Sequence, residues 1–401
     1  MVAKPVLLAL ALMLQHDPAP WLRADTVVVL PDHPRITLIR RPEDPRVALR
    51  WFVPVHEEEA QAGAGRVLAL LAQRRAESYG ERLGATLTVR RTPAGIAYSV
   101  AGSRLDLDHL FDVLRVAMGP PESDPVLTRR ARASALEQID RDLESAERNL
   151  ASRLAGSVCP GSPPIHGTRA TLAELDGSSL QPLWERTHQT PAATQLVVVG
   201  DLPIEVILAA LPRADGNDLM QPRPGRLYAG TAQPNQPGRP QVLRQWYGES
   251  RPAGSAADPR GAVAARLLGR QIGRMDSGVE LTLELVDAGC TTALVILGGA
   301  YRQSAPRLRR AVETLITNTR DRITEGDVTD VALEIRRSWV RRSATPEGVA
   351  ELVGGFEESD GRGSDAESYL GILVRIDRQT MIEYFDALLA TPPVRAELGS
   401  Q

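Results

Sequence analysis

The chain has 401 residues, of which 43% are hydrophobic and 24% charged. This is the composition of a globular protein, and it excludes a disordered or fibrous chain. At roughly 150 residues per domain, the length predicts two or three domains that need no disulfide or metal to fold. The 47 basic and 50 acidic residues leave a formal net charge of −3, so no overall field favours nucleic acid or an anionic membrane as a partner.

Residues 1–24 form an N-terminal extension with a short apolar run. Val6–Leu14 follows Lys4 and has the length of the apolar part of a secretory signal. No Ala-x-Ala cleavage pattern follows, and the run is shorter than the roughly 20 residues that span a bilayer. We therefore expect no membrane span. The compartment stays open, with the cytoplasm favoured over export.

From Asp25 onward, short β-branched runs alternate with long amphipathic ones. Val47–Val55 has the continuous apolar character of a buried strand, whereas Gly63–Leu83 has apolar residues at helical spacing. Tight turns between neighbouring strands predict antiparallel pairing. In chain order we expect strands Thr26–Leu30, Ile36–Arg40, Val47–Val55, Ala85–Arg91, Gly95–Ala101 and Gln195–Val199, and helices Gly63–Leu83, Asp106–Met118, Pro125–Leu154 and Pro203–Leu211.

Residues 213–240 contain five prolines with several Gly and Asn, which is typical of a linker between domains. Beyond it the same order of elements returns at an offset of about 195 residues, which indicates an internal duplication. We expect an α+β fold of two duplicated domains, 25–212 and 241–401, each an antiparallel sheet packed with helices, facing each other across a cleft. The second set comprises strands Gln241–Glu249, Val279–Val286 and Thr291–Gly298, and helices Ala257–Met275, Pro306–Ile323 and Asp327–Arg342.

This arrangement and several short stretches resemble the insulinase or pitrilysin-like family of zinc metallopeptidases, in its small bacterial two-domain branch. The resemblance covers nearly the whole chain from about Asp25. It implies a metallopeptidase half-clamp fold. Its carriers are Trp51–Val55 before a Gly-Ala-led helix, Leu83–Leu87, Pro164–Thr168 followed by Leu172–Leu175, and Leu196–Asp201.

The family's inverted zinc motif, His-x-x-Glu-His on the first helix, is missing. In that motif two imidazoles on one helix face bind Zn²⁺, a glutamate between them activates water, and a later helix supplies a third ligand. The corresponding helix here offers Arg66 and Leu70, and the six histidines include no pair at ligand spacing. Glu137 falls where the resemblance places the third ligand; it is either a solvated residue near Arg141 or a residue facing the cleft. We expect no catalytic residue, no metal ligand and no cofactor in this chain, with zinc only in a partner chain.

Two other parts of the family's substrate site have counterparts. Silent members keep an Arg and a Tyr that bind the substrate backbone; here Arg270 and Arg274 lie in a shortened segment without the tyrosine. Family members also bind substrate as a strand added to an exposed sheet edge, which needs main-chain hydrogen bonds and no metal. An ordinary edge strand is the other interpretation. The matching positions are Thr86, Leu87, Thr88 and Val89.

Three further signals concern cysteines and local charge. Cys159 and Cys290 lie far apart and form no Cys-x-x-Cys pair, so they indicate neither a disulfide framework nor a zinc site. His56–Glu59 precedes a helix, which favours a charged cap over a metal site. Gly355–Ser364 is polar and contains glycine, which predicts a mobile loop between helices.

The resemblance implies a catalytically silent subunit. It would pair with a zinc-bearing peptidase chain as a heterodimer and supply chamber wall and substrate-binding surface for peptide processing. The alternative is a non-proteolytic binding or assembly protein of the same fold, including a homodimer. No nucleic-acid partner is expected, because aromatic residues make up only 4% of the chain.

Overall fold

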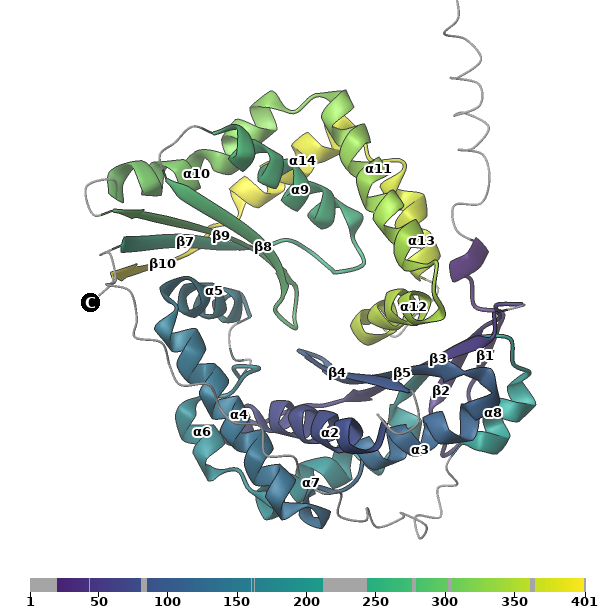
Figure 1. Cartoon of the computed structure of the whole chain (residues 1–401). Coiled ribbons are helices and arrows are strands. Elements are labelled where there is room, and N and C mark those ends of the chain that lie inside the picture. The colour runs from purple at the N-terminus through teal and green to yellow at the C-terminus, as the bar shows by residue number, and fades with distance from the viewer. Residues whose placement is uncertain are drawn as a thin grey trace, which may run out of the picture.

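The computed structural model describes residues 20–42, 44–80, 85–159, 161, 163–211, 244–275, 279–301, 305–360 and 365–399. Two sheets, each covered by helices, form two halves of the molecule (Figure 1). The predicted α+β fold is confirmed. The expected linker, 213–240, and most of the 1–24 extension lie outside the described residues, and the domain boundaries stay a prediction.

The N-terminal half contains β1 Thr26–Val28, β2 Arg35–Ile39, β3 Arg46–Pro54, β4 Thr86–Thr92, β5 Gly95–Ser103 and β6 Gln195–Val199, with α2 Ala64–Gly80, α3 Leu107–Ala117, α4 Pro125–Glu144, α5 Ala146–Ser157, α6 Arg169–Glu174, α7 Gly177–His188 and α8 Ile204–Ala210. The sheet order is β1-β2-β6-β3-β5-β4, so β4 lies at one edge. Alternate residues of β3, Val47, Leu49, Trp51 and Val53, are buried in the core under the helices.

One strand pair differs from the expected antiparallel sheet. β2 and β6 pair in parallel, whereas the pairs β1–β2, β3–β6, β3–β5 and β4–β5 are antiparallel. Tight turns constrain only strands that follow each other directly. Because β2 and β6 are separated by the six helices α2–α7, no turn determines their relative direction.

The C-terminal half contains β7 Arg244–Pro252, β8 Glu280–Asp287, β9 Thr292–Tyr301 and β10 Val394–Gly399, with α9 Pro259–Arg274, α10 Ala305–Arg322, α11 Glu325–Arg342, α12 Pro346–Asp360, α13 Asp365–Leu373 and α14 Arg378–Ala390. Its antiparallel sheet has the order β10-β7-β9-β8. The elements from β3 to α5, and β6, have counterparts from β7 to α12, and β10, that begin 194–200 residues later. The two halves therefore repeat one topology. No helix in the described ranges is long and apolar enough to cross a bilayer.

In each half, one helix packs against the sheet of the other half. The predicted helix 125–154 ends at Glu144, because Ser145 is extended and its side chain accepts a 3.4 Å hydrogen bond from the Arg148 amide, which caps a new helix. That helix, α5, packs Leu150 and Leu154 against β9 (Figure 1). Gly248 of β7 leaves room for it, since a β-carbon there would lie 2.5 Å from Leu154 Cδ1.

The corresponding helix α12 packs on β3, β5 and β6 of the N-terminal sheet (Figure 1). The predicted loop 355–364 is therefore wrong for residues 355–360, which complete α12; residues 361–364 lie outside the described part. Val349, Val353 and Phe356 are buried at helical spacing, and this apolar stripe extends the helix into a polar sequence.

Candidate functional site

Two adjoining cavities lie between the halves, with volumes of about 580 and about 590 Å³. We call the two together the central groove. Its size suits a small molecule or a few residues of peptide. Both cavities are lined by Arg91, Pro93, Ala94, Ile165, Asp287 and Glu358.

The turns of two hairpins meet in this groove. The β4–β5 turn carries Pro93, and the β8–β9 turn carries Gly289 with a positive φ of 93°. A β-carbon added at Gly289 would lie 3.3 Å from Pro93 Cβ. The first cavity extends from this contact toward the end of α5 at Gly156, and the second toward α12.

A buried ion pair joins α12 to the N-terminal sheet. Arg50 of β3 and Glu358 of α12 have side chains only 7% and 8% exposed. Arg50 Nε donates a 2.9 Å hydrogen bond to Glu358 Oε1, and Nη1 donates to Ser99 Oγ at 3.0 Å. Burial raises the pKa of the Glu358 carboxyl, and the Arg50 charge opposes that rise. The sequence pattern does not predict this pair, because Glu358 lies in the segment expected to be a loop.

A second buried pair caps α2 at the groove wall. Glu57 accepts hydrogen bonds from the amides of Gly63 at 2.7 Å and Gly65 at 2.9 Å. Arg91 Nη2 donates to the same carboxylate at 2.9 Å. The charged cap predicted for His56–Glu59 is thus confirmed, with Glu57 as the capping residue.

The side of α2 that the resemblance assigns to zinc carries a cation. Arg66 Nη1 donates to the His166 carbonyl at 3.5 Å. Burial lowers the pKa of Arg66. The pKa of His166 is also lowered, mainly by burial and secondly by the charge of Arg66. Leu70 packs on the core of this half, and Glu137 is exposed on α4. These residues do not fit a zinc ion, and no three His, Cys, Asp or Glu of the described chain lie close enough together to bind a metal.

The remaining predicted site residues fall in two places. Thr86, Leu87, Thr88 and Val89 lie on the edge strand β4, and Thr88 lines the second cavity. Arg270 and Arg274 of α9 instead form ion pairs with α11, to Glu334 and Asp327, each at 3.2 Å. Neither arginine lines either cavity of the central groove.

The stretch Pro164–Thr168, one carrier of the resemblance, packs against the start of α2. Gly167 has a φ of 71°, and a β-carbon there would lie 2.5 Å from the Ala62 carbonyl oxygen. Thr171 Oγ1 donates to the same oxygen at 2.8 Å. This stretch therefore shapes the groove wall through backbone packing, with His166 lining the second cavity.

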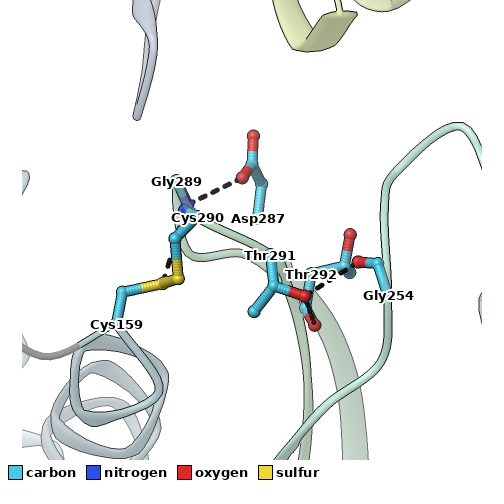
Figure 2. Close-up of a disulfide and its surroundings, with 7 residues drawn as sticks. All are labelled: Cys159, Gly254, Asp287, Gly289, Cys290, Thr291 and Thr292. Carbon is cyan, nitrogen blue, oxygen red and sulfur yellow. Dashed lines mark hydrogen bonds between the residues drawn. A yellow bond between two sulfur atoms is a disulfide. The ribbon is translucent and has the colours of Figure 1, made fainter.

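Cys159 and Cys290 form a disulfide across 131 residues of sequence (Figure 2). The spacing of the two cysteines in the sequence did not indicate this bond. Cys159 follows α5 and Cys290 lies in the β8–β9 turn. The two cysteines meet because α5 packs on the sheet of the C-terminal half. The spacing of the cysteines in the sequence does not predict this packing.

Neither family profiles nor curated proteins match the sequence. Solved structures do share its fold. The periplasmic protease PqqL from Escherichia coli aligns with a TM-score of 0.69 and 11% identity, over 94% of this chain and 46% of PqqL. A protease from Helicobacter pylori gives 0.70 and 12%, over 92% and 98% of the two chains. An inactive domain of peptidase M16 from Pseudomonas fluorescens gives 0.71 and 13%, over 93% and 97%.

A chain of Complex III2 from Candida albicans also aligns, with a TM-score of 0.68 and 11% identity, over 93% of this chain and 95% of that one. This chain spans about half the length of PqqL. At such identities the likeness concerns architecture alone. The chain has the fold of M16 peptidases, which include an inactive domain.

Proposed function

We propose that this chain is a catalytically silent M16-like subunit that pairs with a zinc-bearing peptidase chain. In that heterodimer it supplies chamber wall and a binding surface for extended peptides. The partner supplies Zn²⁺, the general base and the cleavage step.

The observation that carries the proposal is the chemistry at the start of α2. Arg66 occupies the helix face expected to bind zinc, and Arg91 lies at the nearby capping carboxylate of Glu57. Guanidinium groups repel a divalent cation and offer it no lone pair. The fold around this position is nevertheless that of the peptidases.

Peptide binding is supported by β4 and the second cavity. β4 is an edge strand, so one row of its main-chain groups can pair with an added strand whatever the peptide's sequence. Thr88 and Arg90 of this strand line the cavity, together with the aromatic side chains of Trp339, Phe356 and Tyr369 from the other half. Apolar or aromatic peptide side chains would pack against that cluster.

We also propose an oxidising compartment. Disulfides persist outside the cytosol and are rare within it. The Cys159–Cys290 bond therefore favours export over the cytoplasm, which the missing cleavage pattern after the N-terminal run had favoured. PqqL, which shares the fold, is a periplasmic protease.

The test is reconstitution with a chain of similar length from the same host that carries His-x-x-Glu-His. We expect a stable complex whose cleavage of unfolded peptides is lost with a chelator and exceeds the activity of either chain alone. Thr88→Trp, which fills part of the second cavity, should raise KM. Ala133→Trp, at an exposed residue of α4 that lines neither cavity, should not.

Two outcomes would overturn the pairing. One is full activity of the zinc chain without any complex. The other is isolation of this chain from its host within an assembly that contains no zinc-motif chain. The second outcome supports the alternative of an assembly protein. A chain of Complex III2, which is a multi-chain assembly, has the same fold.

A further inference from the structure

The disulfide links two elements that line the first cavity. Ala155 and Gly156, at the end of α5, line one side. The β8–β9 turn, residues 287–290, lines the other. The bond between Cys159 and Cys290 closes this side of the groove covalently.

The turn has an anchored base and a separate tip. At the base, Thr291 Oγ1 donates to the Gly254 carbonyl at 2.9 Å, and the Thr292 amide donates to the same oxygen at 2.8 Å (Figure 2). At the tip, two hydrogen bonds lie within the turn: the Ala288 amide donates to the Thr291 carbonyl at 2.9 Å and the Gly289 amide donates to Asp287 Oδ1 at 2.9 Å. Release of Cys290 would therefore remove the covalent link between the tip and α5 without detaching the base, while Ala288 would still pack against the apolar cluster that contains Leu150, Leu154 and Ala155.

The two sulfur atoms are chemically unequal. Cys290 is an exposed residue in the cavity wall, whereas Cys159 is 3% exposed. The Cys290 amide also donates a 3.3 Å hydrogen bond to Cys159 Sγ (Figure 2). An incoming thiolate reaches Cys290 more easily, and the donated hydrogen bond stabilises Cys159 as the leaving thiolate.

We propose that the Cys159–Cys290 disulfide is a redox-sensitive clasp on the central groove, opened by a dithiol that attacks Cys290. The first thiolate of the dithiol bonds to Cys290 Sγ, and the Cys159–Cys290 bond breaks with its electron pair leaving on Cys159. The second thiolate then displaces Cys290 and closes the reductant as a disulfide. The dithiol loses two electrons, and its two protons end on Cys159 and Cys290.

Opening is confined to one side of the groove. Reduction removes the covalent link between the tip and α5, and leaves the packing of Ala288 on the apolar cluster of α5 as a contact that can open and close. On the other side, α12 remains attached through the Arg50–Glu358 ion pair, which contains no redox-active group. Opening of the disulfide thus widens the first cavity while both sheets remain folded. This inference does not depend on the proposed pairing with a peptidase.

Glutathione trapping tests the direction of attack on the oxidised full chain. The chain has only two cysteines, so peptide mapping of the adduct is unambiguous. After brief exposure to glutathione and acid quenching, we expect the adduct on Cys290 to exceed that on Cys159 about tenfold. An adduct mainly on Cys159, or none on the folded chain, overturns the proposal.

Hydrogen exchange after reduction with dithiothreitol tests the opening. Exchange at residues 287–290 and at the end of α5 should accelerate about tenfold, whereas β5 and β6, in the opposite core, should stay unchanged. Cys159→Ala and Cys290→Ala should reproduce this pattern; reduction of the wild-type chain gives the result even if a variant fails to fold. No change at the tip, or an equal rise throughout the chain, overturns the clasp.

Discussion

Replacing Arg50 by methionine should leave the Glu358 carboxylate buried without its charge partner. Both side chains are less than one-tenth exposed, and Arg50 also donates to Ser99. Removing one member of such a pair costs about 3–5 kcal/mol, because the remaining charge stays desolvated. We expect that loss in the free energy of unfolding for Arg50→Met, measured by urea unfolding with far-UV circular dichroism at neutral pH.

The pH dependence has a defined sign. Without Arg50, burial remains the largest influence on Glu358 and keeps its pKa above the unfolded value, while the Arg90 charge lowers that pKa and the Asp287 charge raises it. A carboxyl with a raised folded pKa destabilises the folded state increasingly as pH rises through that window. Arg50→Met should therefore lose more stability at neutral pH than at about pH 5.

The double variant supplies the control. Arg50→Met with Glu358→Leu replaces the pair by apolar groups of similar volume, which should bring stability back to within about 1 kcal/mol of the wild type. Hydrogen exchange of the α12 amides would place any loss at this helix. If Arg50→Met and Glu358→Leu each lowered the free energy of unfolding by less than about 1 kcal/mol, the reasoning would be refuted, because the ion pair would then behave as a solvent-exposed one.

Three further predictions concern neighbouring features. Gly354→Ala should lower the free energy of unfolding measured in urea, because the added β-carbon collides with the Arg50 side chain. A β-carbon at Gly355 meets no atom within 4 Å, so Gly355→Ala should raise stability by up to about 1 kcal/mol through helix propensity. Equal effects of the two variants would contradict this prediction. Removing both Cys159 and Cys290 should lower the free energy of unfolding by at most about 5 kcal/mol, from the 131-residue separation; an unchanged urea midpoint would count against it. Burial lowers the pKa of His188 to about 3, so the unfolded chain binds a proton that the folded one does not below about pH 6.5, and stability should fall by up to about 2 kcal/mol by pH 5. His188→Phe should flatten that slope.

Local patterns predicted much of the fold. The apolar run at Val47–Val55 gave the central strand β3, and Gly63–Leu83 covers the helix α2, which ends at Gly80 in the described chain. The repeated order of elements predicted the duplication, because each half must bury one sheet face under its own helices. The helical stretch 125–154 was also recognised, although not its break.

Contacts between the halves could not be predicted in this way. The break at Ser145 sends α5 to the opposite sheet, and only that crossing pairs Cys159 with Cys290. Arg50 and Glu358 meet for the corresponding reason at α12. Each of these groups looks solvated or unpaired in sequence, since hydrophobic periodicity reports which face is buried and not what buries it.

The same distinction between local pattern and contact between distant elements applies to the candidate site residues. Thr86–Val89 lie on an edge strand beside the groove, where local strand pattern and turns place them. Arg270 and Arg274 point instead to ion pairs with α11, a contact between helices that a motif comparison does not encode. The Glu57 cap was recognisable, because acidic residues before a helix satisfy its first amides.

Zinc content measured together with proteolysis tests the central claim most directly. The purified full chain, incubated with excess Zn²⁺ and dialysed, is analysed for bound metal and for hydrolysis of unfolded peptides with and without a chelator. We predict no bound zinc above background and no chelator-sensitive hydrolysis, because Arg66 and Leu70 stand where the resemblance places the zinc ligands. Stoichiometric zinc accompanied by hydrolysis that a chelator stops would contradict a silent subunit.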